Sequence, residues 1–195
     1  TTKGGGSKPY GAIESVTSQK LDGYGYNLIT GSYSGPLLKT KKDSNGVIIK
    51  PSPLRILLTG EYKNVTDPRP SALGVWKIKD DVLKDLEINP LRIAPSGMGT
   101  LRNSEFVNNE DLEWQKANQN VANTNLRLAG KIDCNLNKNI IITAGGNYNY
   151  SKGHNYIYSY SLFNSINNPE EISNKTNLFL RWKQKINVDS LKWIS

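Results

Sequence analysis

The chain has little of the residues on which common catalytic and metal sites depend. Its 195 residues include one cysteine, Cys134, and one histidine, His154. A single cysteine excludes an internal disulfide framework and a multi-cysteine metal site. With only one histidine as well, the sequence offers no zinc site and none of the usual catalytic triads. We therefore expect no enzyme activity, no bound metal and no cofactor.

Long hydrophobic runs are also missing. The longest lies around residues 139–144 and is far shorter than the roughly 20 apolar residues that a membrane-spanning helix needs. The mean hydropathy is −0.54, and 36% of the residues are hydrophobic. These features exclude a helical membrane protein. They are compatible with a membrane β-barrel, whose spans are tilted strands of about 9–11 residues with a much weaker hydropathy signal.

The charge is unbalanced, with a formal net charge of +8. A basic balance permits nucleic-acid binding. The basic residues are scattered, however, and their only local concentration is at Lys39, Lys41, Lys42 and Lys50. No known nucleic-acid-binding motif accompanies them. We interpret this charge as solvated loop charge and expect no nucleic-acid partner.

Strict alternation of apolar and polar residues is the strongest pattern present. In 54–62, Leu54, Ile56, Leu58 and Tyr62 share one parity and Arg55, Thr59 and Glu61 the other; 126–133 and 177–183 alternate in the same way. Side chains of a strand alternate between its two faces, so each segment needs an apolar medium on one side and water on the other. The apolar faces therefore cover a protein core, or they contact lipid while the polar faces line a lumen.

The patterns predict six strands, at 10–19, 26–34, 54–62, 125–134, 139–150 and 176–186, with a seventh beginning near 191. A helix is predicted over 75–88, with Val75, Ile78, Val82 and Leu86 as its apolar stripe. Asn45-Gly46 predicts a tight hairpin in which 37–38 and 47–49 pair. For Tyr156, Tyr158 and Tyr160, both a strand extension and stacking within a loop remain open.

The connections between these strands alternate in length. Those at 63–122 and 151–174 are long, and those at 135–138 and 187–190 are short, as is typical of transmembrane barrels. The connection 35–53 departs from this rule. Aromatic residues fall at predicted strand ends, as in the girdles at membrane interfaces: Tyr10, Tyr26, Tyr62, Tyr148, Tyr150 and Trp182.

The first third of the chain carries a family resemblance. Residues 13–19 (Ile-Glu-Ser-Val-Thr-Ser-Gln), 21–26 (Leu-Asp-Gly-Tyr-Gly-Tyr) and 34–37 (Ser-Gly-Pro-Leu) resemble the opening barrel hairpin of TonB-dependent outer-membrane receptors of Bacteroidota. Residues 1–5 (Thr-Thr-Lys-Gly-Gly) resemble the close of the plug domain of those receptors.

A further match lies at Asp67–Gly74 and the following segment 79–83, which resemble a loop seen in that group. The resemblance covers residues 1–92; the remainder matches only by its barrel-like pattern. It implies that residues 1–8 are the end of a plug domain and a linker, and that 9–195 are the N-terminal portion of the barrel. The fold class is then all-β: about six or seven antiparallel strands of a roughly 22-stranded transmembrane barrel, with long extracellular loops, one of which carries a short helix.

The function implied by the resemblance is transport at the bacterial outer membrane. Such receptors bind a scarce nutrient, such as an iron chelate, a vitamin or an oligosaccharide, and import it into the periplasm. The implied partners are outer-membrane lipid, the TonB complex through parts of the protein not contained in this sequence, and a surface lipoprotein. Residues 35–53 would be periplasmic, and 63–122 and 151–174 extracellular.

Two groups of site residues follow from this reading. Polar-face residues expected to face the lumen are Arg55, Glu61, Arg127, Lys131, Asp133, Asn147, Asn149 and Arg181. Loop aromatic residues that could contact a ligand are Trp76, Trp114, Tyr156, Tyr158 and Tyr160. For the first group, the simpler alternative is lumen solvation and cross-strand ion pairing; for the second, it is loop packing.

Two other classes compete with the transporter. A secreted β-sandwich that binds glycans would cover its apolar faces with each other. A basic nucleic-acid-binding β-domain would place stacking aromatic residues among its cations. Here Arg127, Lys131, Arg181 and Lys183 lie on polar faces, whereas Tyr148 and Trp182 fall on the opposite ones. The alternative that we retain is the glycan-binding sandwich.

Overall fold

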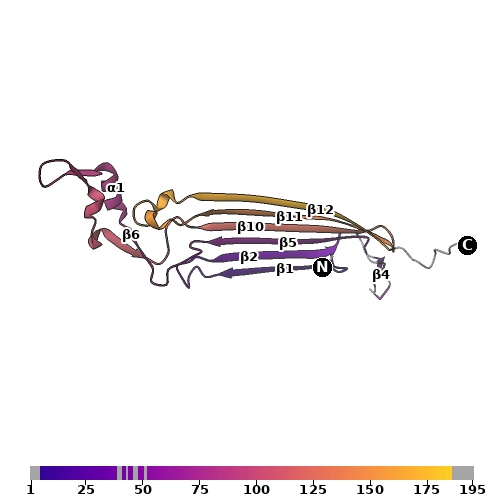
Figure 1. The fold of residues 1–195 in the computed structure, drawn as a ribbon. Helices are drawn as coiled ribbons and strands as arrows, with labels where there is room; N and C mark the ends of the chain where they lie inside the picture. Colours follow the sequence, from indigo (N-terminus) through magenta and orange to yellow (C-terminus); the bar gives the residue numbers. More distant parts are fainter. Residues whose placement is uncertain (1–4, 39–40, 43, 46–47, 51, 186–195) are drawn as a thin grey trace, which may run out of the picture.

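The protein is built on one long antiparallel sheet (Figure 1). A computed structural model describes residues 5–38, 41–42, 44–45, 48–50 and 52–185. Six strands follow one another in chain order across the sheet: β1 (Tyr10–Thr17), β2 (Asn27–Pro36), β5 (Leu54–Val65), β10 (Asn123–Asn135), β11 (Ile140–His154) and β12 (Glu170–Gln184). Each strand pairs only with its chain neighbours in the sheet, so within the described residues β1 and β12 are edges.

All six predicted strands are present, which confirms the all-β class. Several run further than the alternation predicted: β12 begins at Glu170 rather than Thr176, and β11 ends at His154 rather than Tyr150. Apart from Ile172, the extra residues are polar or glycine, so they carry no alternation of their own. They are held in the strand by pairing, since His154 lies opposite Glu170 and Lys152 opposite Ile172. The predicted seventh strand near 191 lies outside the described residues.

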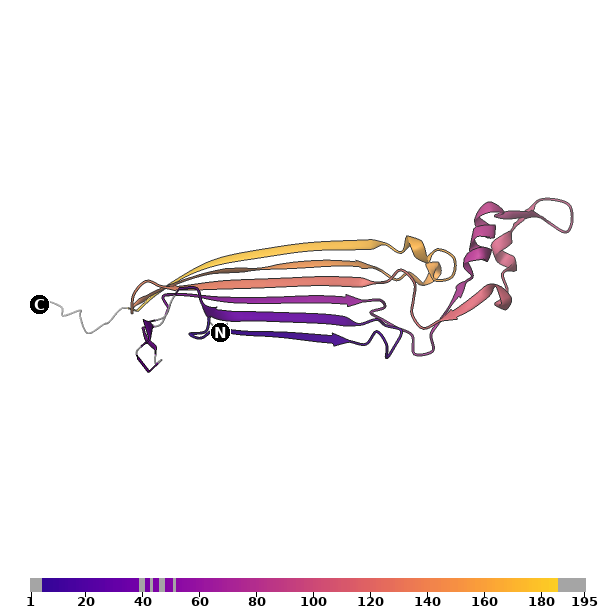
Figure 2. The same cartoon turned by 180° about the vertical axis from the view of Figure 1, so that it is seen from behind.

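The connections lie at the two ends of the sheet (Figure 2), and they do not sort strictly by length, because 37–53 is longer than 155–169 at the opposite end. One end, which we call the loop end, carries the turn 18–26 and the long connections 66–122 and 155–169. The opposite end, which we call the turn end, carries the short turn 136–139, the connection 37–53 and the first and last described residues, 5 and 185 (Figure 1).

The connection 66–122 corrects two predictions. It contains short strands, namely β6 (Val75–Ile78), β7 (Leu91–Ile93), β8 (Thr100–Arg102) and β9 (Leu112–Gln115), although no strand was expected there. Helix α1 covers only Asp80–Ile88 rather than 75–88. Val75 and Ile78 fit either a helical stripe or a strand, and pairing with Gln115 and Leu112 places them in β6. The 3₁₀ turns η1 (Asn103–Phe106) and η2 (Asn109–Asp111) complete this connection.

Two smaller predictions have mixed outcomes. A hairpin does form within 37–53, but its strands are β3 (Lys41–Lys42) and β4 (Ile48–Lys50), so the predicted pairing of 37–38 is wrong. In 155–169, the chain forms the 3₁₀ turns η3 (Tyr158–Tyr160) and η4 (Ser165–Asn167). Tyr156, Tyr158 and Tyr160 therefore belong to a loop and do not extend a strand.

Little of the sheet is covered by other parts of the chain. Among the described residues, the buried apolar side chains are Val65, Ile78 and Val121, all at or beyond the loop end. The middle of the sheet has none. A globular domain of this length ordinarily buries a substantial core, so the described residues form one layer of protein with two accessible faces.

Candidate functional site

All eight polar residues predicted to line a lumen lie on one face of the sheet. Antiparallel residues that face each other project to the same side, so the register sorts them. Glu61, Arg127 and Asn149 form one cross-strand row, Asn147 lies in the next, and Arg55, Asp133, Thr143 and Arg181 form another nearer the turn end. Lys131 lies between these rows. We call this surface the polar face.

The loop-end half of the polar face holds an open hollow of about 510 Å³. Its floor consists of small side chains, because Ala12, Ser32, Thr59 and Ala129 occupy adjacent positions of one row. Arg127 and Glu61 stand at its rim, with 3.2 Å between Nη1 and Oε1. The Arg127 side chain is 61% exposed, so this ion pair is a solvated surface pair.

Nearer the turn end, part of the polar face is buried, although Arg181 in the row of Asp133 is exposed. Asp133 is 6% exposed and Thr143 is 7% exposed. The Thr143 hydroxyl donates to Asp133 Oδ1 over 2.8 Å, and the backbone N–H of Gly5 donates to Asp133 Oδ2 over 3.1 Å. Lys131 Nζ lies 3.9 Å from the same Oδ2. Sequence analysis placed Asp133 on this face but missed its partner Gly5, which is 128 residues away.

The opposite face of the sheet is apolar and uncovered; we call it the apolar face. Ile13 is 85% exposed, Leu178 is 83% exposed and Leu180 is 76% exposed. The exposed large apolar side chains on this face come from five of the six strands: Ile13, Ile29, Tyr33, Leu58, Tyr62, Leu128, Ile132, Ile172, Leu178, Leu180 and Trp182. Strand β11 contributes half-buried side chains such as Ile142 and Tyr148.

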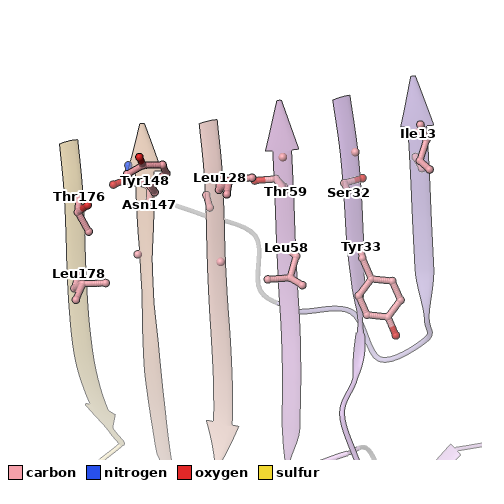
Figure 3. Close-up of a pocket in the computed structure, with 16 residues that line it drawn as sticks. Ile13, Ser32, Tyr33, Leu58, Thr59, Leu128, Asn147, Tyr148, Thr176 and Leu178 are labelled. Atoms are coloured by element: carbon pink, nitrogen blue, oxygen red, sulfur yellow. The ribbon is translucent and has the colours of Figure 1, made fainter. Parts of the chain in front are cut away.

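A shallow hollow of about 660 Å³ crosses the middle of the apolar face (Figure 3). It exists because two glycine pairs, Gly31 with Gly60 and Gly130 with Gly146, contribute no side chains there. Leu58, Leu128 and Leu178 border it, with Ile13, Tyr33 and Tyr148 around them. Its walls are almost entirely apolar side chains.

The apolar face has a defined height. On β11 it runs from Ile140 to Tyr150, ten steps that span about 34 Å along a strand and about 26 Å along a membrane normal at a tilt of about 40°. A row of Thr17, Asn27, Asn64, Thr124 and Lys152 then closes it toward the loop end on five strands, whereas on β12 the same row holds the apolar Ile172. Within that row, Asn64 Nδ2 donates to Thr124 Oγ1 over 2.9 Å.

Aromatic residues border this band. Tyr62 and Tyr150 lie in the row next to the polar one, Tyr148 lies one row further in, and Trp182 lies near the turn end. Tyr10 is an exception, because its register with Ser34 and Leu57 places it on the polar face. Tyr26 precedes β2 and belongs to the turn 18–26.

The predicted loop aromatic residues do not form one site. Trp76 and Trp114 lie opposite each other in the β6–β9 pair. The Trp114 indole N–H donates to the carbonyl of Leu73 over 2.9 Å, which fixes that ring. Tyr156, Tyr158 and Tyr160 lie in the separate connection 155–169, where Tyr158 is 84% exposed. Among these residues, only the two tryptophans are brought together as a pair.

Hydrogen bonds that were not predicted from the sequence hold the connections at the loop end together. Asp67 is 2% exposed. Its Oδ2 accepts from the backbone N–H and the Nδ2 of Asn118, which joins the start of 66–122 to its end. Asn168 donates to the carbonyl of Asn120, and Asn120 donates to the carbonyl of Ile166. The two long connections are therefore fastened to each other.

One buried cation stands inside connection 66–122. The Lys77 ammonium lies 2.8 Å from Glu113 Oε1 and 3.0 Å from Asp80 Oδ1. The hydrogen bond with Glu113 raises the pKa of Lys77, partial burial opposes this, and Asp80 adds to the rise. The ammonium thus holds β6, α1 and β9 together.

Other kinds of site find little support in the described part of the chain. No three His, Cys, Asp or Glu residues are grouped there so that they could hold a metal ion. No described helix has the length and apolar character that crossing a membrane requires. Comparison with protein-family models, with curated proteins and with solved structures found no match.

Proposed function

We propose that this chain forms part of the wall of a transmembrane β-barrel in a TonB-dependent outer-membrane transporter. In this proposal, the polar face lines a passage through which a scarce nutrient, such as an iron chelate, a vitamin or an oligosaccharide, is imported into the periplasm. The activity is uptake and involves no bond-making catalysis. The loop end faces the cell exterior and the turn end the periplasm.

The observation that carries this proposal is the uncovered apolar face, which extends over all six strands. Soluble monomeric proteins rarely expose continuous apolar patches of more than a few hundred Å². Hydrocarbon would solvate Leu128, Leu178 and Leu180 at no cost, and water would solvate Arg127 and Glu61 on the other face. A sheet with one water-exposed polar face and one uncovered apolar face therefore fits the wall of a membrane barrel.

The dimensions of the apolar face give further support. Its height of about 26 Å, obtained above for a tilted β11, is close to the band of about 25 Å found on outer-membrane barrels. The aromatic border at Tyr62, Tyr150 and Trp182 fits the interfacial girdles of such barrels. Unpaired strand edges are not tolerated in hydrocarbon, so the proposal requires further strands to pair with β1 and β12.

The glycan-binding β-sandwich is less well supported. It requires a second sheet packed on the apolar face, and the described residues supply none. The partners that we propose are outer-membrane lipid around the barrel, the TonB complex, a surface lipoprotein at the loop end and the transported ligand. We propose no nucleic-acid partner, because Tyr148 and Trp182 lie on the face opposite Arg127 and Arg181.

Fractionation of cells that express the full-length protein tests the proposal. We expect the protein to remain in the membrane pellet after washes with high salt, alkaline carbonate and urea, and to be released by detergent. An outer-membrane marker protein and a periplasmic marker protein serve as matched controls. Release by the washes together with the periplasmic marker would contradict the barrel and favour the sandwich.

Uptake is tested separately from membrane location. A strain that lacks the full-length protein should lose growth on one or more limiting nutrients from the three proposed classes, and reintroduction of the gene should restore it. Unchanged growth across iron chelates, vitamins and oligosaccharides as limiting nutrients would contradict the transport role while leaving the membrane assignment intact.

A further inference from the structure

The segment before β1 lies across the polar face instead of continuing the line of β1. The Gly5 N–H donates to Asp133 Oδ2 on β10 over 3.1 Å, and the Gly6 N–H donates to Ser34 Oγ on β2 over 2.7 Å. Strand β5 lies between β10 and β2 in the sheet. Two successive residues therefore bridge three strands; we call this the Gly5–Gly6 crossing.

The crossing is in close contact with the wall. Gly5 is buried, and a Cβ added to it would lie 2.8 Å from Arg55 Cβ and 2.9 Å from the backbone nitrogen of Ile56. Such distances are shorter than real Cβ contacts, so only glycine permits this approach. At Gly6, an added Cβ would lie 3.1 Å from Ser34 Oγ.

The crossing supplies one of the hydrogen-bond donors that satisfy the buried carboxylate of Asp133. Elsewhere on the polar face, Arg127 keeps 61% of its side chain exposed, whereas Asp133 is 6% exposed. A buried carboxylate is costly unless hydrogen bonds and charge satisfy it. The Thr143 hydroxyl donates to Oδ1 and the Gly5 N–H donates to Oδ2, and the Lys131 ammonium lies 3.9 Å from Oδ2. Removal of the crossing would take one donor from this carboxylate.

We propose that Asp133 and Ser34 form a latch that holds the Gly5–Gly6 crossing against the polar face at the turn end of the sheet. Asp133 is its stronger half, because hydrogen bonds to a charged acceptor are stronger than those to a neutral hydroxyl. This inference rests on the proposed function in one respect: if the polar face lines a passage, the latch keeps the chain ahead of β1 inside that passage and narrows its periplasmic end.

Amide hydrogen exchange on the full-length protein, purified in detergent, measures the latch directly. In the wild type, the Gly5 and Gly6 amides should exchange more slowly than in an unstructured chain. Asp133→Ala should speed exchange of the peptide that covers residues 5–8 by about tenfold or more, the effect expected for loss of a hydrogen bond to a charged group. Ser34→Ala should give a smaller increase.

Two controls isolate the crossing from the sheet. Asn147→Ala changes another side chain of the polar face, and the exchange of residues 5–8 should not respond to it. Asp133→Asn keeps an acceptor oxygen and should restore part of the protection lost in Asp133→Ala. In each variant, the amides of β10 and β11 should stay protected, which shows that the strands remain paired.

Two results would overturn the latch: unprotected Gly5 and Gly6 amides in the wild type, or equal exchange in Asp133→Ala and Asn147→Ala. If Asp133→Ala disturbs β10 as a whole, Ser34→Ala decides, and an unchanged Gly6 amide in that variant counts against the proposal.

Its role in a passage has its own readout. Cells that carry Asp133→Ala in the full-length protein should become more sensitive to a large antibiotic that the outer membrane normally excludes, and cells that carry Asn147→Ala should not. If Asp133→Ala speeds amide exchange of residues 5–8 but leaves antibiotic entry unchanged, the latch is retained and its role in narrowing the passage is overturned. Release of the protein by aqueous washes would overturn the transporter while leaving the exchange result in force.

Discussion

The two faces of the sheet differ in how their side chains are satisfied. On the apolar face, side chains such as Leu178 and Leu180 are more than three-quarters exposed and have no protein partner layer among the described residues. On the polar face, Asp133 is bonded to Thr143 and Gly5, and Asn177 donates to Asn147 over 2.9 Å. The polar face is thus largely satisfied within the protein and by water, with the buried Nε of Arg55 as an exception among the described residues. The apolar face needs an apolar environment from outside.

The largest expected effect comes from placing a charge on the apolar face. In the proposed barrel, Leu128→Lys and Leu180→Lys should each destabilise the assembly by about 2–4 kcal/mol if the site lies near the bilayer midplane. Asn147→Lys, on the polar face, should be nearly silent. Heat-modifiable gel mobility and the amount of protein in the outer-membrane fraction measure assembly. Equal tolerance of all three substitutions would contradict the assignment of the two faces.

A smaller effect is expected from filling the glycine hollow of the apolar face at two matched positions. At Gly146, an added Cβ would lie 2.5 Å from the backbone oxygen of Asn177 in β12, whereas at Gly31 nothing lies within 4 Å. Gly146→Ala should therefore destabilise by about 1–3 kcal/mol through overpacking. Gly31→Ala should be neutral or stabilise by about 0.5–1 kcal/mol, because alanine loses less backbone entropy than glycine.

Urea titration of the detergent-solubilised full-length protein compares these two variants. The ordering Gly146→Ala less stable than wild type, with Gly31→Ala at least equal to it, tests the packing of β11 against β12. Equal destabilisation by both variants would show that the hollow is filled by something that contacts Gly31 as well.

On the polar face, breaking the exposed ion pair should cost little. Glu61→Gln removes the charge partner of Arg127, whose side chain is mostly exposed. Exposed pairs contribute about 0.2–1 kcal/mol, and less at high salt. We expect a stability change below about 1 kcal/mol in urea titration, reduced further by added salt. A larger, salt-independent loss would mean that this pair is desolvated in the full-length protein.

The face to which each side chain belongs was predictable from sequence, whereas the ends of the strands were not. Period-two alternation depends on nearest neighbours in the chain, so it correctly assigned Leu58, Leu128 and Leu180 to one face and Arg55 and Arg181 to the other. Strand ends such as Glu170 depend on cross-strand pairing with His154. That pairing leaves no local pattern, because both flanking segments are polar.

The features of the candidate site that depend on distant residues were also missed. Asp133 was recognised as a polar-face residue, but its partner Gly5 lies at the other end of the chain. The tie between Asp67 and Asn118 spans a connection with no periodic pattern. Val75 and Ile78 were assigned to a helix, since three-residue spacing suits a helical stripe, until pairing with β9 decided for a strand. Local sequence patterns predict which face of a strand a side chain occupies, whereas polar contacts between distant residues can be identified only from the three-dimensional structure.

The smallest effect concerns a buried cation, Lys77, which contrasts with the exposed Arg127 of the polar face. Because Glu113 and Asp80 raise the pKa of Lys77, the folded form retains the proton more strongly than the unfolded form. The stabilising contribution is fully present below the ordinary value of 10.5 and is lost as the pH rises through the higher folded pKa. As the pH rises, connection 66–122 should therefore begin to loosen only in strong alkali.

Amide exchange of β6 and β9, compared at each pH between the wild type and Lys77→Met, measures this loss. The methionine variant keeps the length and apolar stem of the side chain but carries no charge. We expect the two proteins to differ in β6–β9 protection at pH 7 to 9 and to converge as the pH rises from 10.5 through the raised pKa of Lys77. Convergence already at neutral pH would show that Lys77 acts through packing alone, and that its carboxylate partners add nothing to the fold of this loop.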